Sequence, residues 1–315
     1  MGKEAAKEIL FLKPVFKKTI WGGDRLGKEF GYSEAGCGVG ECWAISAHAN
    51  GDCEVSTGAY GGMTLSSLWN THHELFGAVE GDQFPLLIKI IDAKDDLSIQ
   101  VHPDDTYAKV HENGSLGKTE CWYILDCAED ATIVIGHHAR NREEMAQMIA
   151  DKRWSEFIRE IPVKKGDFFQ INPGCIHAIK GGTLILETQQ SSDITYRVYD
   201  YDRLTDGKPR ELHIEKSLDV VTVPFAENKT SPQVQKQEGS TITRLVECKY
   251  YTVEKLDIDI RYVLSGKDRF VNVSILSGEG TIDGIPVKKG THCIIPAGYG
   301  SVVFAGQMSV VISYV

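Results

Sequence analysis

Short runs of β-branched and aromatic residues, each ended by Gly, Pro, Asp or Asn, recur along most of this chain and constrain its fold strongly. Such runs are typical of β-strands. They include FPLLIKIIDA (84–93), LSIQVH (97–102), CWYILD (121–126), ATIVIG (131–136), DFFQINP (167–173), TLILETQQ (183–190) and ITYRVYDY (194–201). Many short strands without regularly alternating long helices predict a mainly β chain, arranged as a β-sandwich or jelly roll.

Other segments have the apolar spacing of helices and interrupt the strands. MTLSSLWNTHHELFG ends in Gly77, a suitable C-cap, and NREEMAQMIADKRWSEFIREI begins with Asn141, a suitable N-cap. A further segment, RELHIEKSLDVV (210–221), has similar character. We therefore predict α-helices inserted into the β-scaffold, the two largest at about 63–77 and 140–161.

The length of 315 residues favours two core units rather than one. The polar segment 224–241 contains Pro, Asn, Gln and Ser and is the best candidate for a linker. We predict a catalytic unit over residues 1–223 and a C-terminal β unit over residues 242–315.

An internal sequence repeat supports the prediction that both units share one architecture. VKKGDFFQINPGCIHAI, from Val163, resembles VKKGTHCIIPAGYGSVV, from Val287. The matched pairs are Gly166 with Gly290, Ile171 with Ile295, and Gly174 with Gly298. His177 falls opposite Ser301, so we expect the second unit to lack metal ligands.

Charge limits the partners that the chain can bind. The net charge is −10 and the pI is near 5.5, which argues against nucleic acid or an anionic membrane surface. No apolar run is long enough for a membrane helix, and the first residues do not resemble a secretory signal. We expect a cytoplasmic protein, whose anionic substrates would need a local cluster of Lys and Arg.

Four polar residues near strand ends form a possible metal-ligand set. Gln100 and His102 share one face of a strand, because alternate residues of a strand point the same way. Glu120 opens the next strand, and His177 follows the turn Asn-Pro-Gly. Two His with one carboxylate suit a catalytic zinc or a non-haem iron. Each His alone would more often be an ordinary hydrogen-bonded residue.

Cysteine and the remaining histidines offer weaker candidates. None of the eight Cys residues forms a CxxC pair, so a cysteine zinc site is not expected. The pairs His72–His73 and His137–His138 have no second motif element nearby, and we expect them to be solvated.

Several motifs together resemble the type I mannose-6-phosphate isomerases, also called phosphomannose isomerases, in their short bacterial form. The motifs are SIQVHPDD, GKTE and NPGCIHAI, with WGGDRLG and ETQQSSDITYRVYDY at matching places in the order. The resemblance implies two cupin-like β jelly-roll units and one zinc ion per chain. Its ligands would be Gln100, His102, Glu120 and His177. Where the long eukaryotic form has Lys-Pro-Glu, this chain has Thr119 in place of the proline.

The same resemblance assigns roles to residues around the metal. Arg197, Lys118 and Glu187 would be catalytic, whereas Ser98, Lys89, Trp21 and Asp193 would bind the substrate. The reaction implied is the interconversion of mannose 6-phosphate and fructose 6-phosphate through an enediol. Alternatives with the same ligands are an Fe(II) oxygenase of the cupin class and a non-catalytic sugar-binding cupin.

Two charged residues in apolar strands carry specific expectations. Glu187 ends an apolar run, so we expect burial to raise its pKa and to favour a role as general base. Lys89 lies within an apolar strand and needs an anionic partner. That partner is either the substrate phosphate or a nearby carboxylate, Asp92 or Asp95.

Overall fold

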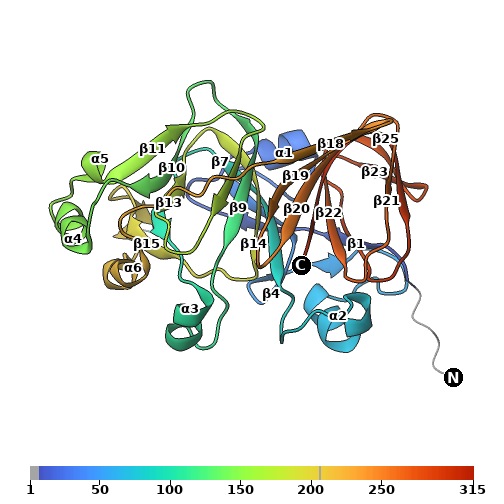
Figure 1. The fold of residues 1–315 in the computed structure, drawn as a ribbon, viewed down its shortest axis with the longest axis horizontal. Helices are drawn as coiled ribbons and strands as arrows, with labels where there is room; N and C mark the ends of the chain where they lie inside the picture. Colours follow the sequence, from blue (N-terminus) through green and yellow to red (C-terminus); the bar gives the residue numbers. More distant parts are fainter. Residues whose placement is uncertain (1–6, 206) are drawn as a thin grey trace.

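The computed structural model describes residues 7–205 and 207–315, and its architecture is mainly β (Figure 1). Two facing antiparallel sheets form the part of the chain that carries the predicted ligands. The six-stranded sheet has the order β12 (Phe168–Ile171), β9 (Glu120–Cys127), β14 (Thr183–Gln190), β7 (Leu86–Ala93), β3 (Val39–Ile45), β2 (Val15–Lys18). The five-stranded sheet has the order β11 (Ile158–Pro162), β10 (Thr132–His137), β13 (His177–Ile179), β8 (Ile99–Val101), β15 (Tyr196–Tyr199). All seven predicted strand segments therefore form strands.

A third, ten-stranded sheet is built mainly from the C-terminal part of the chain. Its main path is β18 (Gln233–Gln237), β19 (Ser240–Glu247), β20 (Thr252–Ile258), β25 (Val302–Tyr314), β22 (Val271–Ile282), β24 (His292–Ile295), β1 (Leu10–Lys13), β6 (Glu54–Val55). β21 (Arg261–Leu264) pairs with β25, and β23 (Ile285–Lys288) pairs with β22. Two small hairpins complete the strands: β4 (Ala47–His48) with β5 (Gly51–Asp52), and β16 (Leu204–Thr205) with β17 (Lys208–Pro209). In Figure 1 the blue strand β1 lies among the red and orange strands of this sheet.

Apolar side chains between the sheets explain the layering. Ile91 and Trp122 of the six-stranded sheet pack with Ile133 and Ile179 of the five-stranded sheet in one buried cluster. The opposite face of the six-stranded sheet packs against the C-terminal sheet, and every residue of β14 is buried. The six-stranded sheet is therefore the central layer, which explains its nearly continuous apolar strands.

Helices cover the outer face of the five-stranded sheet (Figure 1). They are α4 (Arg142–Ala150), α5 (Trp154–Phe157) and α6 (Ile214–Val220). Elsewhere lie α1 (Arg25–Phe30), α2 (Leu65–Thr71), the 3₁₀ turn η1 (His73–Leu75) and α3 (Asp105–His111). The prediction of inserted helices is confirmed at 63–77. No helix of the described residues combines the length and the apolar character that a membrane crossing needs.

The single helix expected over 140–161 is wrong in its second half. Asn141 caps α4 as predicted, with its side chain accepting a 2.8 Å hydrogen bond from the Glu144 N–H. The chain then turns at Lys152, whose φ is 55°, and makes only one further short helix. Residues 158–162 form β11 instead, because they pair with the edge of β10. Pairing with a neighbouring strand overrides the local helical spacing here.

The segment expected as a linker is partly a strand. β18, within residues 224–241, pairs with β19 along its whole length and exposes all of its side chains. The division into units at 1–223 and 242–315 stays a prediction, and the N-terminal β1 pairs with β24 of the second.

The two repeated segments have matching secondary structure and matching backbone φ angles at their glycines. β12 and β24 occupy equivalent places in the two aligned segments. Gly166 and Gly290 both adopt positive φ, 91° and 86°, as do Gly174 and Gly298, 81° and 62°. Such φ values favour glycine, so the four glycines mark turns that both copies share.

Candidate active site

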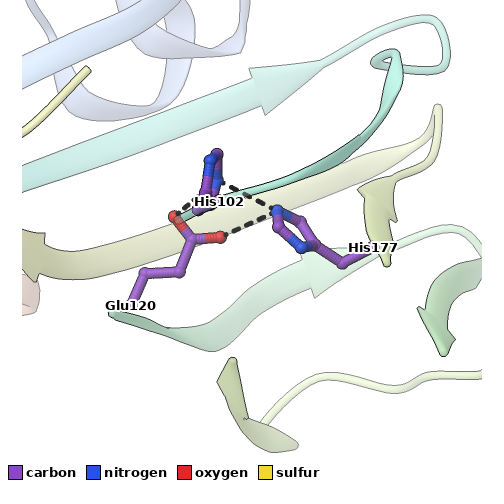
Figure 2. Close-up of side chains that lie close together, drawn as sticks. All are labelled: His102, Glu120 and His177. Atoms are coloured by element: carbon purple, nitrogen blue, oxygen red, sulfur yellow. Dashed lines mark hydrogen bonds and ion pairs between the residues drawn. The ribbon is translucent and has the colours of Figure 1, made fainter. Parts of the chain in front are cut away.

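Three strands of the facing sheets bring His102, Glu120 and His177 together (Figure 2). His102 directly follows β8, while Glu120 and His177 are the first residues of β9 and β13. The His102 Nε2 atom lies 3.1 Å from His177 Nε2 and 3.6 Å from a Glu120 oxygen. His177 Nε2 lies 3.3 Å from the other Glu120 oxygen. All three side chains point to one position that a single cation would fit.

Gln100 lies beside this group because of strand register. It pairs with His177 on one side and with Arg197 on the other. Its amide nitrogen is 3.4 Å from His177 Nε2, and a 180° rotation of the amide would place the oxygen there instead. The structure therefore brings all four predicted ligands to one place.

The protonation states of the two histidines suit metal binding. Burial lowers the pKa of His177 to about 4, and burial with the nearby charge of Lys118 holds the pKa of His102 well below its usual range. His177 is oriented by its Nδ1, which lies 2.9 Å from the carbonyl oxygen of Cys175. If Nδ1 donates this hydrogen bond, Nε2 keeps its lone pair for a metal.

Glu120 supplies the observation that best fits a cation. The side chain is fully buried, yet neither carboxylate oxygen accepts a hydrogen bond from any described residue. Burial and the charge of Glu187 raise its pKa to about 7, although the Lys118 ammonium 3.0 Å away opposes this. A buried carboxylate without hydrogen bonds is costly, and a bound divalent cation would remove that cost.

A cavity of about 210 Å³ opens beside this group. Every residue predicted to be catalytic or substrate-binding lines it: Arg197, Lys118, Glu187, Ser98, Lys89, Trp21 and Asp193, together with Gln100. Sequence reasoning missed four other polar or aromatic lining residues: Glu41, Trp43, Thr195 and Arg210. Glu41 and Trp43 alternate on β3, but only the pairing of β3 with β7 brings them beside Lys89.

One row of four side chains crosses the central sheet, and three of them line the cavity. Trp122, Glu187, Lys89 and Trp43 occupy neighbouring positions on β9, β14, β7 and β3. The Trp122 indole donates a 2.9 Å hydrogen bond to Glu187, and the Lys89 ammonium lies 3.5 Å from the other oxygen of Glu187. The ammonium also lies 5.1 Å from the centre of the Trp43 ring. Cross-strand register thus builds a connected polar row within an apolar layer.

The partners of Lys89 differ from those considered in the sequence. Its ammonium pairs with Glu187 and, at 4.0 Å, with Glu41, whereas Asp92 accepts a hydrogen bond from the Arg25 backbone N–H. Burial opposes the charged form, but the two glutamates outweigh it and raise the pKa of Lys89.

The expected direction for Glu187 is wrong. Burial alone would raise its pKa, as the sequence suggested. The ammonium groups of Lys89 and Lys118, with the Trp122 hydrogen bond, outweigh burial and lower the pKa of Glu187. Glu187 is therefore an ionised carboxylate at neutral pH.

The end of the cavity formed by Arg197 and Arg210 is cationic. Arg197 donates a 3.3 Å hydrogen bond to the Ser98 hydroxyl, and burial with the charge of Arg210 lowers the pKa of Arg197. Arg210 and Arg203 both pair with the single carboxylate of Asp200. Three guanidinium groups around one carboxylate leave an excess of positive charge, inside a chain whose net charge is −10.

The histidine pairs at 72–73 and 137–138 lie outside this site, although not all four are solvated as expected. His138 is exposed, but His137 is buried, with Nε2 3.0 Å from the carbonyl oxygen of Thr222. His73 is half-buried, with its ring nitrogens 3.2 Å and 2.8 Å from the carbonyl oxygens of Trp69 and Val79.

Fold and site together define a cupin-type protein with a buried His/Glu/His group at the base of a polar cavity. Comparison with known proteins then narrows the class. The family description "Phosphomannose isomerase type I, catalytic domain" matches residues 9–123, and "Mannose-6-phosphate isomerase, cupin domain" matches residues 241–315. The chain is 48% identical over 312 residues to the mannose-6-phosphate isomerase ManA of Bacillus subtilis, covering 98% of this chain and 99% of that protein.

Further relatives agree with this result. The mannose-6-phosphate isomerase of Streptococcus mutans is 47% identical and covers 98% of both chains. The crystal structure of the mannose 6-phosphate isomerase from Bacillus subtilis has a TM-score of 0.95 at 46% identity, covering 98% of this chain and 99% of that one. A putative mannosephosphate isomerase from Archaeoglobus fulgidus, at 21% identity and a TM-score of 0.79, shares the fold. The chain belongs to the type I phosphomannose isomerase family, which confirms the resemblance and the expectation of an isomerase.

Proposed function

We propose that this chain interconverts mannose 6-phosphate and fructose 6-phosphate, with one zinc ion held by Gln100, His102, Glu120 and His177. The observation that carries the proposal is the buried Glu120 carboxylate, which accepts no hydrogen bond from the described residues apart from its 3.0 Å ion pair with Lys118, and which faces two neutral histidines at the base of the cavity. Family membership supports the substrate. The family found for the chain consists of isomerases, which disfavours an Fe(II) oxygenase.

When bound, zinc supplies Lewis-acid stabilisation for negative charge that develops on the sugar oxygens. Burial of the ligands and the neutral state of both imidazoles are what such an ion requires. The chain's own groups carry out the proton transfers.

Glu187 is the proposed base on carbon. Its Oε1 accepts no hydrogen bond from the described residues, while Oε2 is held by Trp122. From the open-chain aldose, Glu187 takes the proton from C2 while Lys118 gives a proton to O1, which forms the enediol. Glu187 then returns its proton to C1 while Lys118 takes the proton from O2, so the ketose forms and both residues regain their starting states.

The remaining polar residues of the cavity orient the substrate. Arg197 places a fixed positive charge beside the enediol, with Ser98 as its hydrogen-bond partner. Ser98, Lys89 and the cationic end supply donors for the phosphate. Trp21 contributes an apolar wall. Asp193 also lines the cavity. It accepts a hydrogen bond from the side-chain amide of Asn50 and lies 3.4 Å from His48.

Removal of the metal tests the proposal as a whole. We expect the chelated protein to lose fructose 6-phosphate formation in a coupled assay and to regain it on addition of Zn²⁺, but not of Mg²⁺, because two His ligands favour zinc over hard cations. Metal analysis of the same samples gives the zinc content per chain. A zinc-loaded protein without isomerase activity would contradict the proposed reaction.

Arg210 tests the assignment of the cationic end. We expect Arg210→Gln to raise KM for mannose 6-phosphate about 10-fold with little change in kcat, because a charged hydrogen bond to the phosphate is lost far from the reacting carbons. Arg203→Gln is the matched control, since Arg203 pairs with the same Asp200 but does not line the cavity. Equal effects of the two variants on KM would show that Arg210 acts only through Asp200.

A further inference from the structure

A carboxylate outside the metal group connects four segments of the chain. Asp105, the first residue of α3, accepts three hydrogen bonds. Its Oδ1 accepts from the Gly117 backbone N–H at 3.0 Å and from the Gln190 side-chain amide at 2.9 Å. Its Oδ2 accepts from the Tyr250 hydroxyl at 2.6 Å. These hydrogen bonds lower the pKa of Asp105, so the carboxylate is ionised at neutral pH.

Gln190 extends this connection to the residue between Lys118 and Glu120. Its side-chain oxygen accepts a 2.9 Å hydrogen bond from the Thr119 N–H, and its own N–H donates to the Thr119 carbonyl at 3.0 Å. Both backbone groups of Thr119 are thus held by one residue, and both residues are buried. The adjacent Lys118 N–H donates to the Pro103 carbonyl, directly after His102. The segment 118–120 therefore takes its position from Gln190, and Gln190 from Asp105.

Tyr250 brings the C-terminal sheet into this network. It lies in the turn between β19 and β20, which reaches across to α3. The next residue, Tyr251, anchors the turn, because it is fully buried and its hydroxyl exchanges hydrogen bonds with Gln170 of β12. The hydroxyl of Tyr250 is thus presented from a fixed support rather than from a free loop.

We propose that Tyr250 is a positioning residue for the catalytic segment 118–120, acting through Asp105 and Gln190. The inference rests on the proposed function, since it assigns Glu120 to the metal and Lys118 to proton transfer. Without the Tyr250 hydroxyl, Oδ2 of Asp105 keeps only the exposed Lys249 ammonium, 3.6 Å away, and the carboxylate is held less firmly toward Gln190. The Thr119 N–H then loses its fixed side-chain partner, while its carbonyl keeps the Gln190 backbone N–H, and the Glu120 carboxylate is held less precisely toward the two histidines. The C-terminal sheet would in this way set the geometry of the metal centre.

Tyr250→Phe tests this inference, because it removes only the hydroxyl. We expect the affinity for Zn²⁺, measured by competition with a chromophoric chelator, to fall about 10-fold, as is typical when a supporting hydrogen bond of a metal ligand is lost. The visible absorption of the Co²⁺-loaded protein should shift, and kcat should fall more than KM changes. Tyr262→Phe is the matched control, because Tyr262 lies on β21 in the same unit and packs against Phe304. Unchanged Zn²⁺ affinity and Co²⁺ absorption in Tyr250→Phe would overturn the inference, whatever its melting temperature.

A second variant shows whether the effect passes through Asp105. We expect Asp105→Asn to lower Zn²⁺ affinity, and the double variant with Tyr250→Phe to be little worse than Asp105→Asn alone, because both act on one chain of hydrogen bonds. Fully additive losses would contradict this route. Zn²⁺ binding by the unmodified protein is the reference for both experiments. Its absence would contradict the proposed function, whereas normal binding by the unmodified protein and by Tyr250→Phe alike would contradict only the positioning role.

Discussion

Replacing His102 by Ala is expected to lower kcat for isomerisation by about 10³-fold, equivalent to about 4 kcal/mol of transition-state stabilisation. His102 Nε2 lies at the centre of the group, within 3.6 Å of both His177 and Glu120, so its loss leaves too few ligands for tight binding of zinc. Metal analysis after dialysis should show a zinc content near zero, and the coupled assay should show the loss of turnover.

His138→Ala is the matched control for this variant. His138 is an exposed histidine directly after β10, outside both the metal group and the cavity. We expect it to keep zinc and activity. Melting curves add an independent measurement, since Zn²⁺ should raise the melting temperature of the unmodified protein and of His138→Ala but not of His102→Ala. A His102→Ala protein that keeps zinc and full turnover would refute the ligand assignment.

Most of the fold follows from local sequence, because alternation and apolar runs specify strands directly. The exceptions are places where a distant strand decides the outcome. Residues 158–162 have helical spacing but complete the edge of β10, and residues 233–237 have linker composition but pair with β19. The local sequence does not show whether the edge of a distant strand is available for pairing.

The same distinction applies to the candidate site, where some residues could be predicted from local sequence and others depend on strand pairing. Gln100, His102 and Glu120 lie close in sequence, and their spacing at strand ends predicts that they are metal ligands. Glu41 and Trp43 could not be predicted as cavity residues, because only the register of β3 against β7 places them beside Lys89. The resemblance to a known family supplied the roles of the more distant residues.

The pKa of Glu187 shows why burial alone does not decide the state of an ionisable group. The apolar strand around Glu187 led to the expectation of a raised pKa. The sequence alone does not show that Lys89 on the neighbouring strand, Lys118 beyond it and the Trp122 indole all face the same carboxylate. The balance between desolvation and neighbouring charge depends on three-dimensional contacts.

This balance leads to a large expected effect on stability. Lys89→Met, studied in the presence of chelator, should lower the free energy of unfolding at pH 7 by about 3–5 kcal/mol, because it leaves the buried carboxylate of Glu187 without its closest cation. Denaturant titration gives this value. Lys28→Met is the control, since Lys28 is an exposed lysine paired with Asp24, and surface pairs of this kind contribute little to stability.

The double variant Lys89→Met/Glu187→Gln should recover a large part of the loss, since it removes both charges rather than one. Recovery in the double variant distinguishes an uncompensated charge from a simple packing defect, which would make the double variant no better than Lys89→Met. Comparable stability losses in Lys89→Met and Lys28→Met would contradict the argument altogether.

The pH dependence of the same variant has a definite sign. In the unmodified protein the folded pKa of Glu187 is below its unfolded value of about 4.3, so its ionised form adds stability above that pH and loses it as pH falls through the folded pKa. In Lys89→Met, burial dominates and raises the folded pKa, so ionised Glu187 destabilises the fold at neutral pH and protonation relieves it. The stability difference between the two proteins should therefore be largest near pH 7 and shrink as pH approaches about 4. A difference that stays constant over this range would mean that the lost stability comes from packing around Lys89 rather than from the charge on Glu187.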